Sequence, residues 1–279
     1  MAHKHANRNR ESLELIVLEP KLRVARCRVL GQDKELTLRC HSAESMVPGE
    51  IIVVEPRTWK EGAKGLVLSA DFVGERVDPE ALGLVPLALR DCGLFDPAEE
   101  LYFEDGAALE SWEKRILERG PRQAFEMQQV LPGSRFDDVD DDILRAVELN
   151  GSGQEDRARG LLVGLLAEDL RCLDAYAHIG CFWFDDWPHG AKRAYAVGVA
   201  IGELSLGANF DGVLPWGWID NRPFLRCLHG LGISNLELGE LDEARAIFER
   251  LLSLNPNDNQ GARFLLGEME KRERLDDPR

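Results

Sequence analysis

The chain has 279 residues and a formal net charge of −16, and 44% of its residues are hydrophobic. This length and composition allow two units that each bury a core, so disorder throughout the chain is excluded. No apolar run approaches the roughly 18 to 20 residues of a membrane-spanning helix, and the polar start MAHKHANRNRE is unlike a secretory signal. We therefore expect a cytoplasmic protein without a membrane partner.

The charge is unevenly distributed along the chain. Residues 1–65 carry a formal charge of +3, residues 66–136 carry −7 and residues 137–279 carry −12. An acidic surface repels a phosphate backbone, so the carboxyl-terminal two-thirds are not expected to bind nucleic acid and favour basic partners instead. Nucleic-acid binding stays open for the first segment alone.

The six cysteines are scattered, and they form no CxxC pair with a matching histidine spacing. Small apolar cysteine side chains suit protein cores, so buried free thiols are favoured over a metal site or a disulfide. His3 and His5 lie in the polar tail of residues 1–12, which is expected to be disordered and solvated. No metal or cofactor is predicted. The cysteines are Cys27, Cys40, Cys92, Cys172, Cys181 and Cys227.

Residues 13–78 have a hydrophobic period of two. In KELTLRC, Leu36 and Leu38 alternate with Glu35 and Thr37, which is typical of a half-buried strand. Because closure hides the edges of a small sheet, the segment predicts a small antiparallel β-barrel-like domain. Turn residues separate five such strands, at about 13–18, 22–30, 34–40, 50–55 and 66–74.

Basic residues lie on the second and third of these strands and around the following turn. A single-strand binder needs cations along a groove together with aromatic faces for stacking. Here Trp59 and Phe72 could stack, but nine acidic residues are interleaved within residues 1–65. A solvated face, or a dock onto the acidic part of the chain, is therefore favoured over nucleic-acid binding. The cations are Arg23, Arg26, Arg28, Lys34, Arg39, Arg57, Lys60 and Lys64.

Residues 79–136 predict a connector with short helices. The clearest helix covers residues 107–119, with apolar residues on one side, and Gly120-Pro121 ends it. Another turn or helix is expected through Val130, with Phe125, Met127 and Val130 as core contacts.

Five aspartates then precede the helical run ILRAVEL. Clustered carboxylates can hold Mg²⁺ or Ca²⁺, but the EF-hand spacing with its glycine and distal glutamate is missing. Acidic groups at a helix amino terminus meet the positive end of the macrodipole, so a helix cap is the favoured interpretation. The aspartates are Asp137, Asp138, Asp140, Asp141 and Asp142.

Residues 137–279 have helical periodicity arranged in pairs, at about 143–149 with 155–170, 173–184 with 189–204, and a third within 224–256. Ala158, Ala191 and Ala244 occupy matching positions, separated by 33 and 53 residues. An insertion at about 205–223 explains the longer separation, and a last helix from Asn259 onward suits capping.

The third pair resembles a tetratricopeptide repeat. It keeps that family's Leu-Gly, Ala, Phe and terminal Pro as Leu231-Gly232, Ala244, Phe248 and Pro256, and departs from it at Leu228, Asn235 and Leu251. The runs PWGWIDNRPFLRCLHGLG and GPRQAFEMQQVLPG extend the likeness to a group of uncharacterised bacterial tetratricopeptide-repeat proteins, over most of the chain after about Leu82. The resemblance implies a bacterial α-helical repeat stack, in an α+β chain, with no assigned reaction.

The insertion is too apolar for a plain spacer. Its rings belong to Trp216, Trp218, Phe210 and Phe224, while interspersed proline and glycine forbid a regular helix. The rings either pack down as a lid or form part of a partner site, where tryptophan is over-represented. Both alternatives stay open.

The resemblance also implies a concave binding face built from the first helix of each pair. Arg226, His229 and Arg263 would form a cationic corner there, suited to a carboxylate from an acidic segment or a chain terminus. The Lys and Asn set of the chaperone-tail clamp is absent, which puts that ligand in doubt. The inward positions are Asp174, Ala177, Cys181, Phe184, Arg226, His229, Ile233, Leu236, Gln260 and Arg263.

Sequence signatures of catalysis are missing. No GxGxxG, Walker-type loop, HExxH or GxSxG occurs, and Cys40 and His41 are strand neighbours whose side chains point to opposite faces. His178, His189 and His229 are interpreted as structural. We therefore predict a non-catalytic protein-interaction module with a protein or peptide partner. The alternatives are an RNA or single-stranded nucleic-acid adaptor that uses the β domain, and an enzyme with an unrecognised site at the junction.

Overall fold

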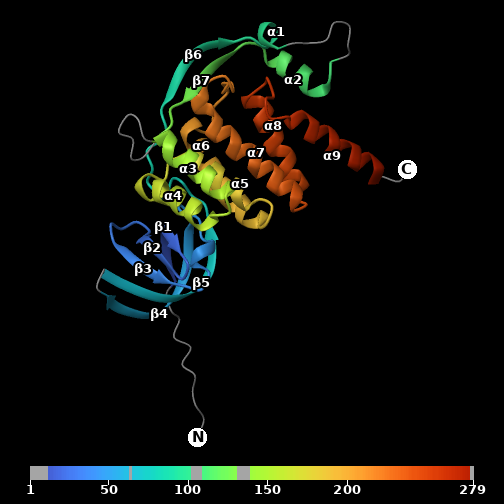
Figure 1. The fold of residues 1–279 in the computed structure, drawn as a ribbon. Helices are drawn as coiled ribbons and strands as arrows, with labels where there is room; N and C mark the ends of the chain where they lie inside the picture. The colour runs from blue at the N-terminus through green and yellow to red at the C-terminus, as the bar shows by residue number, and fades with distance from the viewer. Residues whose placement is uncertain (1–11, 63–64, 102–108, 131–138, 277–279) are drawn as a thin grey trace. The chain divides into compact units, whose positions relative to one another are not determined.

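The computed structural model describes residues 12–62, 65–101, 109–130 and 139–276, and the side chains of residues 142–272 in the last range (Figure 1). The chain divides into two compact units, residues 1–84 and 85–279. His3, His5, Lys64 and the side chains of the aspartates from 137 to 141 lie outside the described residues, so the predictions made for them stay predictions.

The first unit is a closed five-stranded barrel with the strand order β1-β2-β3-β5-β4. It is mixed, because β3 and β5 pair in parallel with Leu38 opposite Leu68, so the prediction of an antiparallel barrel was wrong at this pair. The alternation of residues indicates which side chains face inward but does not indicate which strands pair. Since β4 is antiparallel to both β1 and β5, β5 must run in the same direction as β1 and β3. The strands are β1 (Leu13–Lys21), β2 (Val24–Val29), β3 (Glu35–Arg39), β4 (Ile51–Gly62) and β5 (Gly65–Arg76).

The inward side chains of every strand fill the barrel, as the period of two requires. The buried set includes Leu15, Val17, Ala25, Cys27, Leu36, Leu38, Ile52, Val54 and Leu68. Between β3 and β4, the short 3-10 helix η1 (Ala43–Ser45) brings Met46 into the same core. Glu50 is buried beside it, and its carboxylate accepts a hydrogen bond of 2.8 Å from the backbone N–H of Val47.

The second unit begins with an antiparallel hairpin of β6 (Leu89–Phe95) and β7 (Arg122–Met127). Residues 122–127 therefore form a strand, where the sequence predicts a turn or helix. The strand depends on partners distant in the chain, which local sequence does not reveal. Met127 is fully buried as expected, while Phe125 and Val130 are half-buried. Between the strands lie α1 (Pro97–Glu100) and α2 (Ser111–Arg119).

Helices occupy the rest of the second unit, as predicted (Figure 1). Each packs against the next along the chain, and α5 also packs against α3 and α7. The helices are α3 (Val139–Gly151), α4 (Glu155–Glu168), α5 (Leu173–Trp183), α6 (Pro188–Leu206), α7 (Arg222–Glu237), α8 (Leu241–Leu254) and α9 (Ala262–Asp276), with the 3-10 helix η2 (Ile219–Asn221) before α7.

The segment between α6 and α7 is held against β7. The backbone of Val213 exchanges hydrogen bonds of 2.9 Å with Gln123 and Phe125, and Val213 itself is fully buried. The buried Asn221 side chain accepts a hydrogen bond from the Met127 N–H (2.8 Å) and donates one to the Phe125 carbonyl (2.9 Å). These contacts fix the backbone of the predicted insertion onto the hairpin.

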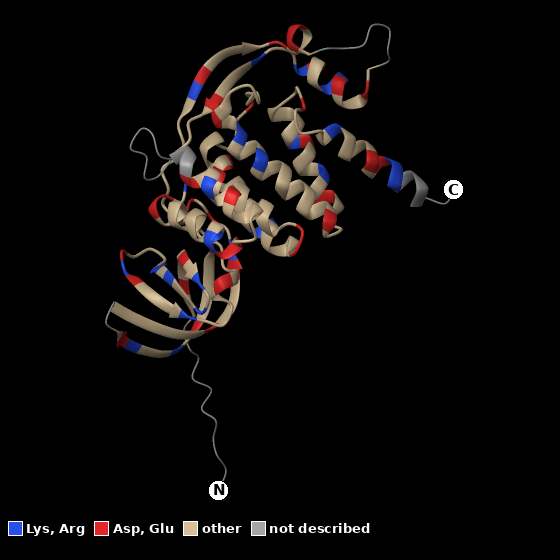
Figure 2. Cartoon of the chain, viewed as in Figure 1, with Lys and Arg blue, Asp and Glu red and all other residues tan. Residues whose placement is uncertain are grey.

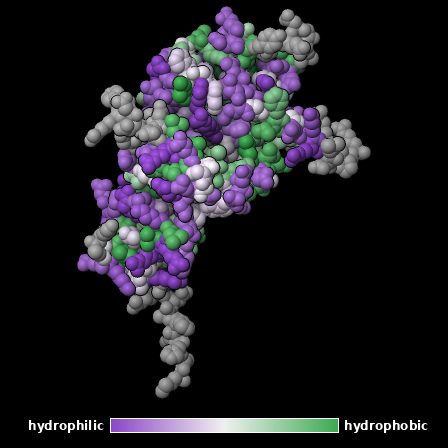
Figure 3. Space-filling view, viewed as in Figure 1, coloured by the Kyte–Doolittle hydropathy of each residue, from purple (hydrophilic) through white to green (hydrophobic). Residues whose placement is uncertain are grey.

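Charged residues of both signs are interleaved on the barrel strands and on the helices (Figure 2). On the face seen in Figure 3, hydrophilic residues cover much of the surface and hydrophobic residues gather in patches. Within the part of the chain that the structure describes, no helix combines the length and the apolar character needed to cross a membrane.

Candidate functional site

A groove of about 480 Å³ lies between α5 and α7. Residues three and four apart share one face of a helix, and this spacing brings the lining side chains of each helix to the groove. Seven of the ten inward positions expected from the sequence line it. The lining residues are Ala177, His178, Cys181, Phe184, Asp185, Tyr195, Arg226, His229, Gly230, Ile233 and Gln260.

The ring of Tyr195, from α6, forms part of the groove lining between the two helices. A Cβ atom on Gly180 of α5 would stand 2.5 Å from Cε1 of this ring, and a Cβ atom on Gly230 of α7 would also clash with the ring. Only glycine at both positions leaves room for the ring. Burial raises the pKa of the Tyr195 hydroxyl, so the residue stays a neutral phenol at physiological pH.

The charged edge of the groove centres on Asp174. Its carboxylate accepts a hydrogen bond of 3.1 Å from Nη1 of Arg226, and Nε2 of His178 lies 3.8 Å from the same oxygen. The Arg226 side chain remains 42% exposed. Because a guanidinium carries five N–H donors, Arg226 can hold Asp174 and still donate to a ligand.

The two groove histidines are uncharged at pH 7. Burial lowers the pKa of His178, and the nearby Arg226 lowers it further, although Asp174 acts in the opposite direction. Burial also lowers the pKa of His229, and a hydrogen bond to the Gln260 backbone opposes that shift. Neutral imidazoles can donate or accept hydrogen bonds there, and the positive charge of the groove comes from Arg226.

Arg263 is not among the residues that line this groove. Its guanidinium lies 4.6 Å from the ring of Phe264 and 5.6 Å from that of Trp112, with Nε 3.7 Å from the Asp258 carboxylate. The structure therefore brings Arg226 and His229 to one groove and gives Arg263 different neighbours. The contact with Trp112 is a tertiary one between residues far apart in the chain, which helical periodicity does not indicate.

The two tryptophans of the insertion have different neighbours. Trp216 is half-buried beneath the guanidiniums of Arg222 and Arg226, at 5.3 and 5.9 Å from its ring centroid. Trp218 is 38% exposed, with the Arg90 guanidinium at 5.0 Å. Trp216 is thus linked to the groove through Arg226, whereas Trp218 is linked to the β6–β7 hairpin.

All six cysteines are free thiols, but they differ in burial. Cys27, Cys172 and Cys227 are buried, and burial raises the pKa of the first two to about 12. Cys181 is exposed, contrary to the prediction of buried thiols, because its side of α5 faces the groove. Cys40 and Cys92 are partly exposed.

On the barrel, several of the predicted cations have acidic or aromatic neighbours. Arg26 pairs with Glu35 at 3.1 Å and with Glu19 at 3.4 Å, and the Lys34 ammonium lies 5.9 Å from the ring of Trp59. The interpretation of this part of the barrel as a solvated face stays a prediction. Arg23, Arg39 and Arg57 line a separate pocket.

Sequence reasoning missed the part of Tyr195 in the groove and the pairing of Arg226 with Asp174. The sequence signal for Tyr195 was one large aromatic residue between two helical glycines, Gly180 in α5 and Gly230 in α7. Among the described side chains, no three or more His, Cys, Asp or Glu residues gather as a metal site.

Comparisons with protein-family models, with curated proteins and with solved structures find no match to this chain. Its class is therefore defined by its architecture, an α+β chain with a five-stranded mixed barrel followed by a helical region.

Proposed function

We propose that the protein is a non-catalytic interaction module and that the groove between α5 and α7 binds an extended segment of a protein partner. The observation that carries this proposal is the composition of the groove. Its lining is mainly apolar and includes Ala177, Cys181, Phe184, Tyr195 and Ile233, with a few polar groups beside them. Concave apolar sites with a small number of placed polar groups are typical ligand sites.

We further propose that α3 to α8 are three helix pairs of the tetratricopeptide type, with α9 as the cap. Ala158, Ala191 and Ala244, which the repeat aligns, are all fully buried. Four residues after the second and third of these alanines, the rings of Tyr195 and Phe248 pack against Gly180 and Gly232 of the preceding helices. The packing of α5 against α3 and α7 supports a continuous surface made of first helices.

The charges of the groove favour one carboxylate on the ligand. Arg226 offers exposed donors, and a guanidinium binds a carboxylate in bidentate fashion. Asp174 already pairs with Arg226, and Asp185 also lines the groove, so a long run of acidic residues would be repelled. The ligand that fits best is a short segment with apolar side chains and a single carboxylate, such as a chain terminus.

A peptide library selected on the full-length protein tests this proposal. We expect enriched peptides with apolar residues beside one carboxylate, and at least tenfold weaker binding to the Ile233→Arg and Arg226→Ala variants. Leu241→Arg is the matched control, because Leu241 is 41% exposed at the start of α8 and lies away from the lining residues. Enriched peptides that bind the groove variants as tightly as the wild-type protein would refute the proposal.

A further inference from the structure

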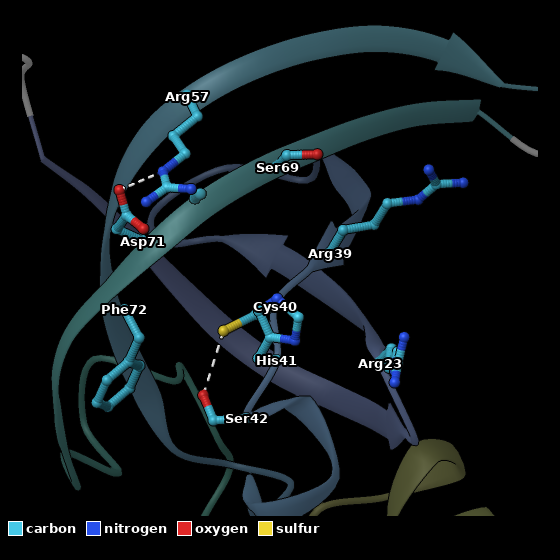
Figure 4. A pocket seen from close by; sticks show the side chains of 10 residues that line it. Arg23, Arg39, Cys40, His41, Ser42, Arg57, Ser69, Asp71 and Phe72 are labelled. Carbon is cyan, nitrogen blue, oxygen red and sulfur yellow. Dashed lines mark hydrogen bonds and ion pairs between the residues drawn. The ribbon is translucent and has the colours of Figure 1, made fainter.

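The barrel carries a pocket of about 520 Å³ near the end of the β3–β5 pairing (Figure 4). The last paired residues of these strands are Arg39 and Ser69. Beyond them the chain leaves the sheet at Cys40 while β5 continues, so the two backbones separate and leave a hollow. The prediction that Cys40 and His41 are strand neighbours with side chains on opposite faces was wrong, because β3 ends at Arg39 and both residues line this hollow. The lining residues are Arg23, Arg39, Cys40, His41, Ser42, Arg57, Ser69, Ala70, Asp71 and Phe72.

The pocket is basic within an acidic protein. It holds three arginines and one aspartate, so its formal charge is +2 with histidine neutral, whereas the chain carries −16. Asp71 accepts a hydrogen bond from Nε of Arg57, which leaves that arginine largely neutralised. Figure 4 shows Arg23 and Arg39 on the other side of the view from this pair.

Arg23 and Arg39 are the two available cations of this pocket. Both residues are exposed, and among the described residues neither side chain makes a hydrogen bond or an ion pair. Other arginines of the barrel are engaged, as Arg26 is with Glu35 and Arg76 is with Glu14. Two unpaired guanidiniums beside one hollow create a site for an oxyanion, and arginine forks match phosphate geometry.

An aromatic face borders the same pocket. Phe72 is 39% exposed, so its ring is accessible to a ligand in the pocket. Figure 4 shows Phe72 on the Asp71 side of the view, across from Arg23 and Arg39, so a ligand that spans the pocket meets a ring at one end and cations at the other. A ring for a planar base and cations for its phosphate are the combination that binds a nucleotide.

We propose that this barrel pocket binds a nucleotide unit, in which Arg23 and Arg39 hold the phosphate and Phe72 stacks on the base. The unit is either a free nucleotide or one residue of a single-stranded nucleic acid, since both present the same chemistry. Because the protein as a whole repels polyanions, recognition is local to the pocket and weakens as salt screens the two arginines. This inference concerns the barrel and is independent of the peptide groove.

Binding measurements on the full-length protein test the inference. Fluorescence anisotropy with labelled 12-mers of single-stranded DNA and RNA, and calorimetry with AMP, UMP and inorganic phosphate, separate the two sources. We expect the Arg23→Ala/Arg39→Ala variant to bind the oligonucleotides or nucleotides at least tenfold more weakly than the wild-type protein does. For an oligonucleotide, the plot of log affinity against log salt should be shallower by about 0.7 for this variant, because the two arginines hold one phosphate and each neutralised phosphate of a single strand contributes about 0.7. Phe72→Ala should weaken the binding of nucleotides but not the binding of inorganic phosphate.

The matched control is Arg26→Ala/Arg76→Ala, which removes the same charge from arginines that are already paired. It should bind within threefold of the wild-type protein, and thermal melts of both variants verify folding. Tight binding of oligonucleotides alone would identify the ligand of the pocket as a single-stranded nucleic acid. Binding of AMP or UMP would identify it as a free nucleotide. The inference is overturned by an absence of nucleotide binding, by binding of inorganic phosphate alone, or by equal losses in the control.

Discussion

The ring of Tyr195 lies so close to the backbone of Gly180 that a methyl group on Gly180 would overlap it, with 2.5 Å between Cβ and Cε1. This contact joins α6 to α5 and places an aromatic surface in the groove. The groove therefore depends on a glycine that no local helix preference would select, because glycine weakens a helix interior.

Gly180→Ala should destabilise the protein by about 1–3 kcal/mol, since the added methyl group overpacks a filled contact. Urea unfolding of the purified variant measures this change. Gly160→Ala is the control, because Gly160 is exposed in α4 and a Cβ atom there meets nothing within 4 Å. That substitution should leave stability unchanged or raise it by up to about 1 kcal/mol. Equal effects at the two glycines would contradict the packing described for Tyr195.

The groove histidines should make stability depend on pH. Both have a pKa below the usual 6.5 in the folded protein, so the unfolded chain binds protons more readily as pH falls through 6.5. The contribution of these histidines to the free energy of unfolding is therefore fully present above pH 6.5. It decreases as the pH falls below 6.5, with a slope of at most about 1.4 kcal/mol per pH unit for each histidine. Urea unfolding between pH 7.5 and 5.5 measures the slope. His178→Gln/His229→Gln should flatten it, and an unchanged slope in this variant would show that other groups titrate.

Cys181 should be the first thiol to react with an alkylating reagent in the folded protein. It is exposed in the groove, whereas burial raises the pKa of Cys27 and Cys172 to about 12 and leaves little thiolate. Mass spectrometry of peptides after brief treatment with iodoacetamide identifies the modified site. A groove peptide should protect Cys181 and leave the partly exposed Cys40 reactive. Faster labelling of a buried thiol would contradict the burial pattern.

Asn221→Ala should cost about 1–3 kcal/mol, because it leaves the buried Met127 N–H and the Phe125 carbonyl without their partner. Thermal or urea unfolding provides the measurement. Asn209, which is exposed in the same connection, supplies the control Asn209→Ala with an expected change within about 0.5 kcal/mol. A similar loss in both variants would indicate that the connection is not held through Asn221.

Much of the fold was predictable from the sequence, because local patterns of apolar residues indicate the strands and the helices. Alternation around Leu36 and Leu38 identified a barrel strand, and the spacing of Ala244 and Phe248 identified a helix pair. Pairing between distant segments was not encoded locally, which explains why the parallel β3–β5 pair and the strand at residues 122–127 were missed.

The candidate groove was predictable to a similar extent. The resemblance to a tetratricopeptide repeat implied that Arg226, His229 and Ile233 share one face, and they do line one groove. The ion pair between Arg226 and Asp174 joins residues 52 positions apart, and the orientation of Arg263 depends on how α9 packs. Both features arise from tertiary contacts, so neither could be read from periodicity.

Cross-linking of a selected peptide tests the central proposal most directly. A peptide from the library, carrying a photoreactive group beside its carboxylate, would be irradiated with the full-length protein and mapped by mass spectrometry. The groove proposal predicts cross-links within residues 177–185 and 226–233, and their loss in Ile233→Arg. Cross-links that fall on the barrel or on α8, and that persist in this variant, would contradict it.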